Sequence, residues 1–225
     1  DGNIQGNILA TGTSLGIHES QSRTWENAIA RGLPFWEQYL PVAKEYFPSR
    51  LDGISLEDFF KGINRVAPGM IRIDADEVTY GLHIILRFRL ELALVSGNLT
   101  VADLPAAWRE LSGKLLGVKP ELGSEAELQD IHWSMGALGY FPTYALGNLY
   151  GAQFFHSMQR EIPAMENHIR EGDFAPLRAW LKRQIHRHGA AESADELCLS
   201  VSGEELTADY FLNYLERKFA KVYSI

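Results

Sequence analysis

The sequence has 225 residues and a net charge of −8, with 46% hydrophobic and 22% charged residues. The acidic balance argues against a nucleic-acid partner, because no basic patch offsets it. No apolar run reaches the roughly 18 residues of a membrane span, so we expect no membrane partner. The first residues lack the basic and apolar regions of a signal peptide. The single cysteine, Cys198, allows no internal disulfide, and these features together predict a cytoplasmic protein.

Helical patterns dominate the chain, and no shift in composition marks a domain boundary. A first helix is predicted from Thr13 or Ser14 to about residue 39, with a bend at residues 32–34. Apolar and polar residues alternate over residues 70–74, which predicts a short strand. Other helices are predicted between Pro41 and Pro48, over residues 55–66, 75–95, 143–169, 174–187 and 207–222, and from capping residues Thr100 and Ser124. The chain is therefore predicted to be a single all-α domain, residues 1–225, with at most a small β-element.

The predicted helix over residues 75–95 is apolar on nearly all sides, which is typical of a buried helix. His83 and Arg87 lie one turn apart in it. Because an unpaired buried charge costs several kcal/mol, Arg87 must have an oppositely charged partner.

The segment around His18 and Glu19 is unusually polar for a helix that also carries Trp25 and Ile29. The simplest interpretation is an amphipathic helix in which Glu19 and Arg23 form an ordinary i,i+4 pair. A functional interpretation is the alternative at this stage, because His and Glu side chains together can bind metal or transfer protons.

A complete helical zinc motif is absent from the sequence. None of the seven histidines has a second histidine four residues later. His186 and His188 are two apart, but they lie in a basic stretch that we expect to be exposed. The sequence also lacks a glycine-rich phosphate loop and the strand-turn-helix context of a serine hydrolase.

Two further segments carry candidate catalytic side chains. Residues 129–133 (QDIHW) place His132 beside a tryptophan, where it can act as a proton donor or satisfy a backbone group structurally. Residues 139–144 (GYFPTY) combine a rigid turn with two phenols, Tyr140 and Tyr144, which can donate hydrogen bonds to a substrate.

Several motifs occur in the order typical of one family. Residues 12–22 (GTSLGIHESQS), 71–80 (IRIDADEVTY), 82–88 (LHIILRF), 129–133 and 139–144 resemble the carboxypeptidase Taq family of HExxH metallocarboxypeptidases. The resemblance implies a mostly helical, two-armed fold with a groove and a small β-element near the metal. It also implies a cytoplasmic homodimer that removes single residues from peptide C-termini with broad specificity.

The resemblance also implies roles for particular residues. Glu19 corresponds to the third ligand of zinc or another divalent metal, and His18 is its neighbour. Arg72 is the first choice for binding the carboxylate of the peptide C-terminus, and Arg87 is the second, because a guanidinium suits a carboxylate. The residues implied to line the cleft and support the scissile carbonyl are His132, Tyr140 and Tyr144.

The chain departs from the family in one respect that matters for activity. Family members carry HExxH before the segment of Glu19, and this sequence does not contain it. The chain therefore resembles only the C-terminal half of a member, in truncated or split form, and is predicted to be inactive unless another polypeptide supplies HExxH. One alternative is a non-catalytic helical module that binds peptides or a partner through Arg72, His132 and Tyr144. Another is a metal held by Glu19, His18 and either His83 or His132.

Overall fold

The computed structural model describes residues 6–225, and every regular element in that range is helical. The predicted all-α class is confirmed. No helix in the described range is long and apolar enough to cross a membrane. The described residues divide into two compact units, one formed by residues 6–64 with 146–225 and the other by residues 65–145.

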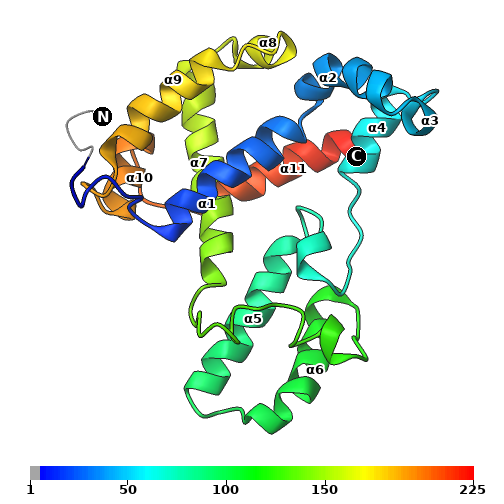
Figure 1. The fold of residues 1–225 in the computed structure, drawn as a ribbon, viewed down its shortest axis with the longest axis vertical. Coiled ribbons are helices and arrows are strands. Elements are labelled where there is room, and N and C mark those ends of the chain that lie inside the picture. Colours follow the sequence, from blue (N-terminus) through cyan, green and yellow to red (C-terminus); the bar gives the residue numbers. More distant parts are fainter. Residues whose placement is uncertain (1–5) are drawn as a thin grey trace. The chain divides into compact units, whose positions relative to one another are not determined.

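The first unit contains most of the helices shown in Figure 1. Its helices are α1 (Leu15–Arg23), the π-helix η1 (Thr24–Ala30), α2 (Leu33–Tyr46), α3 (Pro48–Leu51), α4 (Leu56–Ile63), most of α7 (Pro142–Glu161), α8 (Met165–Arg170), α9 (Ala175–Gln184), the 3₁₀ turn η5 (His186–His188), α10 (Ala194–Ser202) and α11 (Asp209–Tyr223).

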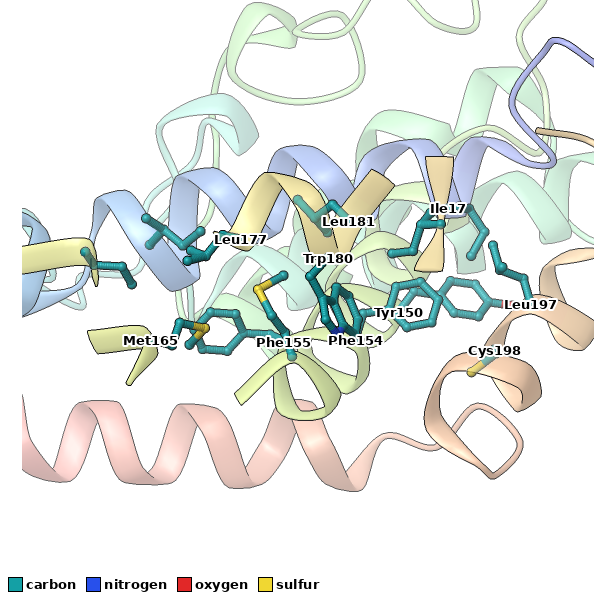
Figure 2. Close-up of a cluster of buried hydrophobic side chains, with 14 residues drawn as sticks. Ile17, Tyr150, Phe154, Phe155, Met165, Leu177, Trp180, Leu181, Leu197 and Cys198 are labelled. Atoms are coloured by element: carbon teal, nitrogen blue, oxygen red, sulfur yellow. The ribbon is translucent and has the colours of Figure 1, made fainter. Parts of the chain in front are cut away.

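The core of this unit is formed where α7, α9 and α10 meet α1. Trp180 and Leu177 of α9 are fully buried, as are Phe154 and Met158 of α7 and Cys198 of α10. Figure 2 shows these apolar side chains gathered between the helices. Burying side chains of this size contributes about 1.5–3 kcal/mol each, so this cluster is the main source of stability in the unit.

Helices α1 and α7 cross closely because α7 has glycines at the crossing (Figure 1). A Cβ atom on Gly147 would lie 2.4 Å from Cγ of Glu19, and one on Gly151 would lie 3.1 Å from the carbonyl oxygen of Ser20. Any larger residue at position 147 would displace Glu19. The position of Glu19 therefore depends on the absence of a side chain on the neighbouring helix.

The second unit is built on two packed helices, α5 (Tyr80–Val95) and α6 (Leu104–Leu116). Leu86 and Leu90 of α5 pack against Leu104 and Trp108 of α6. The unit also contains three 3₁₀ turns, η2 (Arg72–Asp74), η3 (Val101–Asp103) and η4 (Gly123–Glu125).

Several local predictions are wrong. Residues 70–74 form an irregular segment with the turn η2 and not a strand, because Arg72 turns inward to a buried partner. No helix follows Ser124, and α10 was not predicted although Ser193 and Glu196 form a capping box there. Pro41 lies inside α2 and does not begin a helix. The single helix predicted over residues 143–169 is α7 and α8, which Pro163 separates.

Candidate functional site

A buried carboxylate joins two arginines in the second unit. Oδ1 of Asp130 accepts hydrogen bonds from Nε and Nη2 of Arg72 at 2.9 and 2.7 Å, and Oδ2 accepts one from Nε of Arg87 at 2.6 Å. The side chains of Asp130, Arg72 and Arg87 are 7%, 9% and 0% exposed. Asp130 is therefore the partner that the sequence requires for Arg87, and it holds Arg72 as well.

The three groups shift each other's ionisation. Burial would raise the pKa of the Asp130 carboxyl, but the hydrogen bonds and charges of the two arginines outweigh it and lower that pKa. Burial also opposes the charge on Arg72, yet Asp130 raises the Arg72 pKa above its usual value. The pKa of Arg87 falls to about 10 because burial prevails there. All three groups are charged at neutral pH, so the cluster carries one excess positive charge.

Neighbouring groups fix the orientation of both guanidinium groups. Nη1 of Arg72 donates to the hydroxyl of Tyr80 at 3.1 Å, and the backbone N–H of Arg72 donates to Oε1 of Gln129 at 2.8 Å. Nη1 of Arg87 donates to the carbonyl oxygen of His83 at 3.0 Å. Nη2 of Arg87 is buried and has no hydrogen-bond partner among residues 6–225. An unsatisfied donor beside an excess positive charge favours an anionic ligand.

His132 lies among aromatic rings close to this cluster. Its Nε2 is 3.0 Å from the hydroxyl of Tyr144, and its ring contacts those of Tyr140 and Phe141. Burial and the charge of Arg72 lower the His132 pKa, so its imidazole is neutral at pH 7. Nδ1 of His132 is buried and has no hydrogen-bond partner in the described part of the chain. A neutral imidazole and a phenol side by side can donate hydrogen bonds to a carbonyl oxygen.

The loop that carries Asp130 and His132 is tied to α5 by a second buried carboxylate. Glu91 of α5 accepts a hydrogen bond from Nε1 of Trp133 at 2.7 Å and another from the backbone N–H of Gly139. Both ends of the segment between Trp133 and Gly139 are therefore anchored to one side chain. This anchoring keeps the loop in place although it forms no regular helix.

Glu19 and His18, the predicted metal ligand and its neighbour, lie on α1 in the first unit. Glu19 forms an ion pair of 2.8 Å with Arg23, the i,i+4 pair expected from the spacing. His18 is exposed and, with Gln21 and His186, lines a cavity of about 410 Å³. Nε2 of His186 is 2.9 Å from Oε1 of Gln21, and His186 is exposed as predicted. His188 was also predicted to be exposed, but it is half-buried, with its Nδ1 2.7 Å from Oε1 of Glu192.

The described residues do not form a metal site by themselves. Within residues 6–225, no group of three His, Cys, Asp or Glu side chains is placed to hold a metal ion. A tetrahedral zinc site in a hydrolase needs three protein ligands, and Glu19 supplies one carboxylate.

The sequence analysis named five of the side chains that form this candidate site in the second unit. They are Arg72, Arg87, His132, Tyr140 and Tyr144. It assigned no role to Asp130 or Tyr80. The requirement of Arg87 for a buried carboxylate was the available signal for Asp130, which lies in the same motif as His132, residues 129–133.

Comparison with known proteins agrees with these motifs. Residues 1–219 match the family described as Carboxypeptidase Taq (M32) metallopeptidase. The chain is 49% identical over 210 residues to Thermostable carboxypeptidase 1 of Thermus thermophilus, covering 93% of this chain and 41% of that protein. It is 40% identical to Carboxypeptidase 1 of Bacillus subtilis, covering 98% of this chain and 44% of that protein.

Solved structures give the same result. The M32 carboxypeptidase of Deinococcus radiodurans R1 matches with a TM-score of 0.96 and 38% identity, over 100% of this chain and 46% of that one. The Pyrococcus furiosus carboxypeptidase matches with a TM-score of 0.94 and 42% identity, over 97% of this chain and 44% of that one. The chain thus spans less than half the length of these relatives. On this similarity across nearly all of its residues, the chain belongs to the carboxypeptidase Taq (M32) metallopeptidase family.

Proposed function

We propose that this chain provides the substrate-binding part and one metal ligand of a carboxypeptidase that releases C-terminal residues from peptides with broad specificity. The proposal rests chiefly on the Arg72–Asp130–Arg87 cluster, which combines an excess positive charge with an unsatisfied donor. The carboxylate of a peptide C-terminus has the charge and the acceptor geometry that such a cluster favours.

Arg72 is the first candidate to bind that carboxylate. Three N–H groups of its guanidinium donate hydrogen bonds to Asp130 and Tyr80, which leaves its other N–H groups for a ligand. Arg87 is the second candidate, because its side chain is fully buried and a ligand would have to reach past other groups. His132, Tyr140 and Tyr144 are proposed to orient and polarise the scissile carbonyl, since a neutral imidazole and phenols donate hydrogen bonds at neutral pH.

Glu19 is proposed to be one ligand of a divalent metal, most simply zinc, with His18 as its neighbour. The other ligands and the general-base glutamate would come from an HExxH segment, which this sequence does not contain. We therefore propose that residues 1–225 are inactive by themselves and are completed by a segment that bears HExxH, with homodimerisation as the other form of assembly. The single cysteine, which is buried and free, supports a cytoplasmic location.

Complementation tests this proposal. The chain would be co-expressed with the part of Bacillus subtilis Carboxypeptidase 1 that it does not match, supplied with Zn²⁺, and assayed for release of C-terminal amino acids. We expect activity from the mixture and none from the chain alone. Glu19→Gln should abolish the activity. Glu26→Gln is the matched control, because Glu26 also pairs with Arg23, at 3.5 Å, and is not a proposed ligand.

Three results would contradict the proposal. Zinc bound stoichiometrically to residues 1–225 alone, together with unaided peptidase activity, would refute the need for an HExxH-bearing segment. A folded complex without activity would refute the catalytic role. If that inactive complex still bound a peptide with a free C-terminus more tightly than its amide, the non-catalytic peptide-binding module would be the correct function.

A further inference from the structure

Helix α5 has three faces, and two of them are covered within its own unit. Leu86 and Leu90 lie on the face that packs against α6. A second face carries His83, Arg87 and Glu91, which are buried against the loop of residues 127–141. Both covered faces thus have clear structural roles in the second unit.

The third face of α5 is apolar and exposed. Ile85, Phe88, Leu92 and Val95 are 39%, 48%, 56% and 69% exposed. Their spacing of three, four and three residues places them in one stripe along the helix. A helix that is apolar on nearly all sides was predicted to be buried, and this exposed face is the part of that prediction that the structure overturns.

The spacing of the stripe points to a helical partner. Apolar residues at alternating steps of three and four residues form the seam through which two α-helices pack side by side. The stripe runs from Ile85 to Val95 of α5, so at a rise of about 1.5 Å per residue the seam is about 15 Å long. A contiguous apolar surface of this kind marks an interaction site more often than free solvent contact.

The charge beside the stripe constrains the partner. Arg89 lies next to Phe88, is exposed, and has no ion-pair partner among residues 6–225. In an antiparallel pair of two α5 helices, Arg89 would lie near the two-fold axis and face its own copy. In a parallel pair it would face residues equivalent to Ile84 and Glu91, which are buried inside the unit. A second copy therefore offers Arg89 no exposed carboxylate.

We propose that this stripe binds an amphipathic α-helix of the HExxH-bearing segment, with an acidic residue of that helix opposite Arg89. This chain matches only 41–46% of the length of these relatives. The remaining part of their sequences can supply such a helix. The inference rests on the proposed function, because it names the surface on which the completing HExxH-bearing segment packs.

Binding variants test the inference in the co-expression system described above. Phe88→Asp and Leu92→Asp should each weaken the complex at least about tenfold, because they place a charge in the centre of the apolar seam. Arg89→Glu should weaken it less and should reduce its sensitivity to salt. Val101→Asp is the matched control, since Val101 is 79% exposed in the same unit but lies on η3 and off the stripe.

The readouts separate this inference from the proposed function. Complex mass by light scattering reports docking, peptidase activity reports function, and circular dichroism confirms that each variant is folded. If the complex forms and is active but all the variants bind equally, the docking surface is wrong and the proposed function stands. If the chain alone is a dimer that Phe88→Asp dissociates, a second copy occupies the stripe and the inference is overturned. If no complex forms at all, both proposals fail.

Discussion

Arg87 and Asp130 form a 2.6 Å ion pair in which the arginine side chain is fully buried, although the two residues are 43 positions apart in the sequence. The carboxylate of Asp130 also forms an ion pair with Arg72, so one negative charge is shared by two positive charges. The pair is therefore a structural requirement of the unit and also the basis of the proposed carboxylate site.

Removing the charge of Asp130 should be costly. Asp130→Asn leaves two buried guanidinium groups without a counter-ion, so we expect the free energy of unfolding to fall by about 3–5 kcal/mol in urea titrations. Asp52→Asn is the matched control, because Asp52 is exposed and makes no ion pair within residues 6–225. It should change stability by less than about 0.5 kcal/mol. Similar values for the two variants would show that the cluster does not depend on this charge.

His83 should make stability depend on pH in the acidic range. Burial, followed by the charges of Arg87 and Arg72, lowers the His83 pKa from 6.5 to about 4. The unfolded chain therefore binds a proton between these values while the folded chain does not, so stability falls as the pH drops from 6.5 towards 4. The contribution of one such group is at most about 1.4 kcal/mol per pH unit.

The measurement compares urea titrations across that pH window. His83→Gln should have a shallower dependence of stability on pH than the parent protein. The comparison concerns the slope, so a general loss of stability in His83→Gln does not affect it. Equal slopes for the parent and His83→Gln would contradict the lowered pKa.

Local signals predicted the beginnings of helices better than their interiors. Ser14 and Ser55 cap α1 and α4 as expected, because a serine side chain accepts a backbone N–H of the first turn, which is a local contact. Ser193 caps α10 in the same way, and its capping box with Glu196 was a readable signal that was overlooked. Ser124 carried the same kind of signal without a helix, because contacts from elsewhere hold the segment that follows.

Tertiary contacts explain what the sequence could not predict. Gln129 bonds the carbonyl oxygen of Met70 at 3.1 Å and Asp130 binds two distant arginines, so residues 124–133 follow an irregular path. The same contacts turn residues 70–74 into a 3₁₀ turn and not a strand. The motifs predicted which residues of the second unit belong to the candidate site, but only the structure identifies Asp130 as the group that organises them.

Arg72→Lys should selectively weaken binding of peptides with a free C-terminus. Lysine keeps the charge but loses the planar guanidinium, which contacts Asp130 and Tyr80 and is proposed to contact the substrate. We expect at least about a tenfold rise in Kd for a peptide acid and little change for the matching peptide amide, measured by fluorescence anisotropy. Arg65→Lys, at an exposed position in the same unit, is the control. A similar loss for acid and amide would indicate a structural role for Arg72 and not recognition of the carboxylate.

Gly147→Ala should disturb the helix crossing that positions Glu19. The added Cβ would lie 2.4 Å from Cγ and 2.7 Å from Cβ of Glu19, so α1 and α7 must separate. Overpacking of this kind costs about 1–3 kcal/mol. Gly62→Ala is the matched control, because it lies within α4 with no atom near the new Cβ. There alanine should stabilise the helix by roughly 0.5–1 kcal/mol. The two variants are thus expected to change stability in opposite directions in the same urea titration.

The same pair of variants also tests the proposed role of Glu19. If Glu19 is a metal ligand in the completed enzyme, moving it with α1 should raise the dissociation constant for Zn²⁺ of the Gly147→Ala complex, while the Gly62→Ala complex should bind Zn²⁺ as the parent does. Ligand positions must be accurate to a few tenths of an ångström, so the shift needed to relieve the contact is large enough to be detected. Unchanged Zn²⁺ affinity in a destabilised Gly147→Ala complex would separate the packing role of Glu19 from metal binding and would count against Glu19 as a ligand.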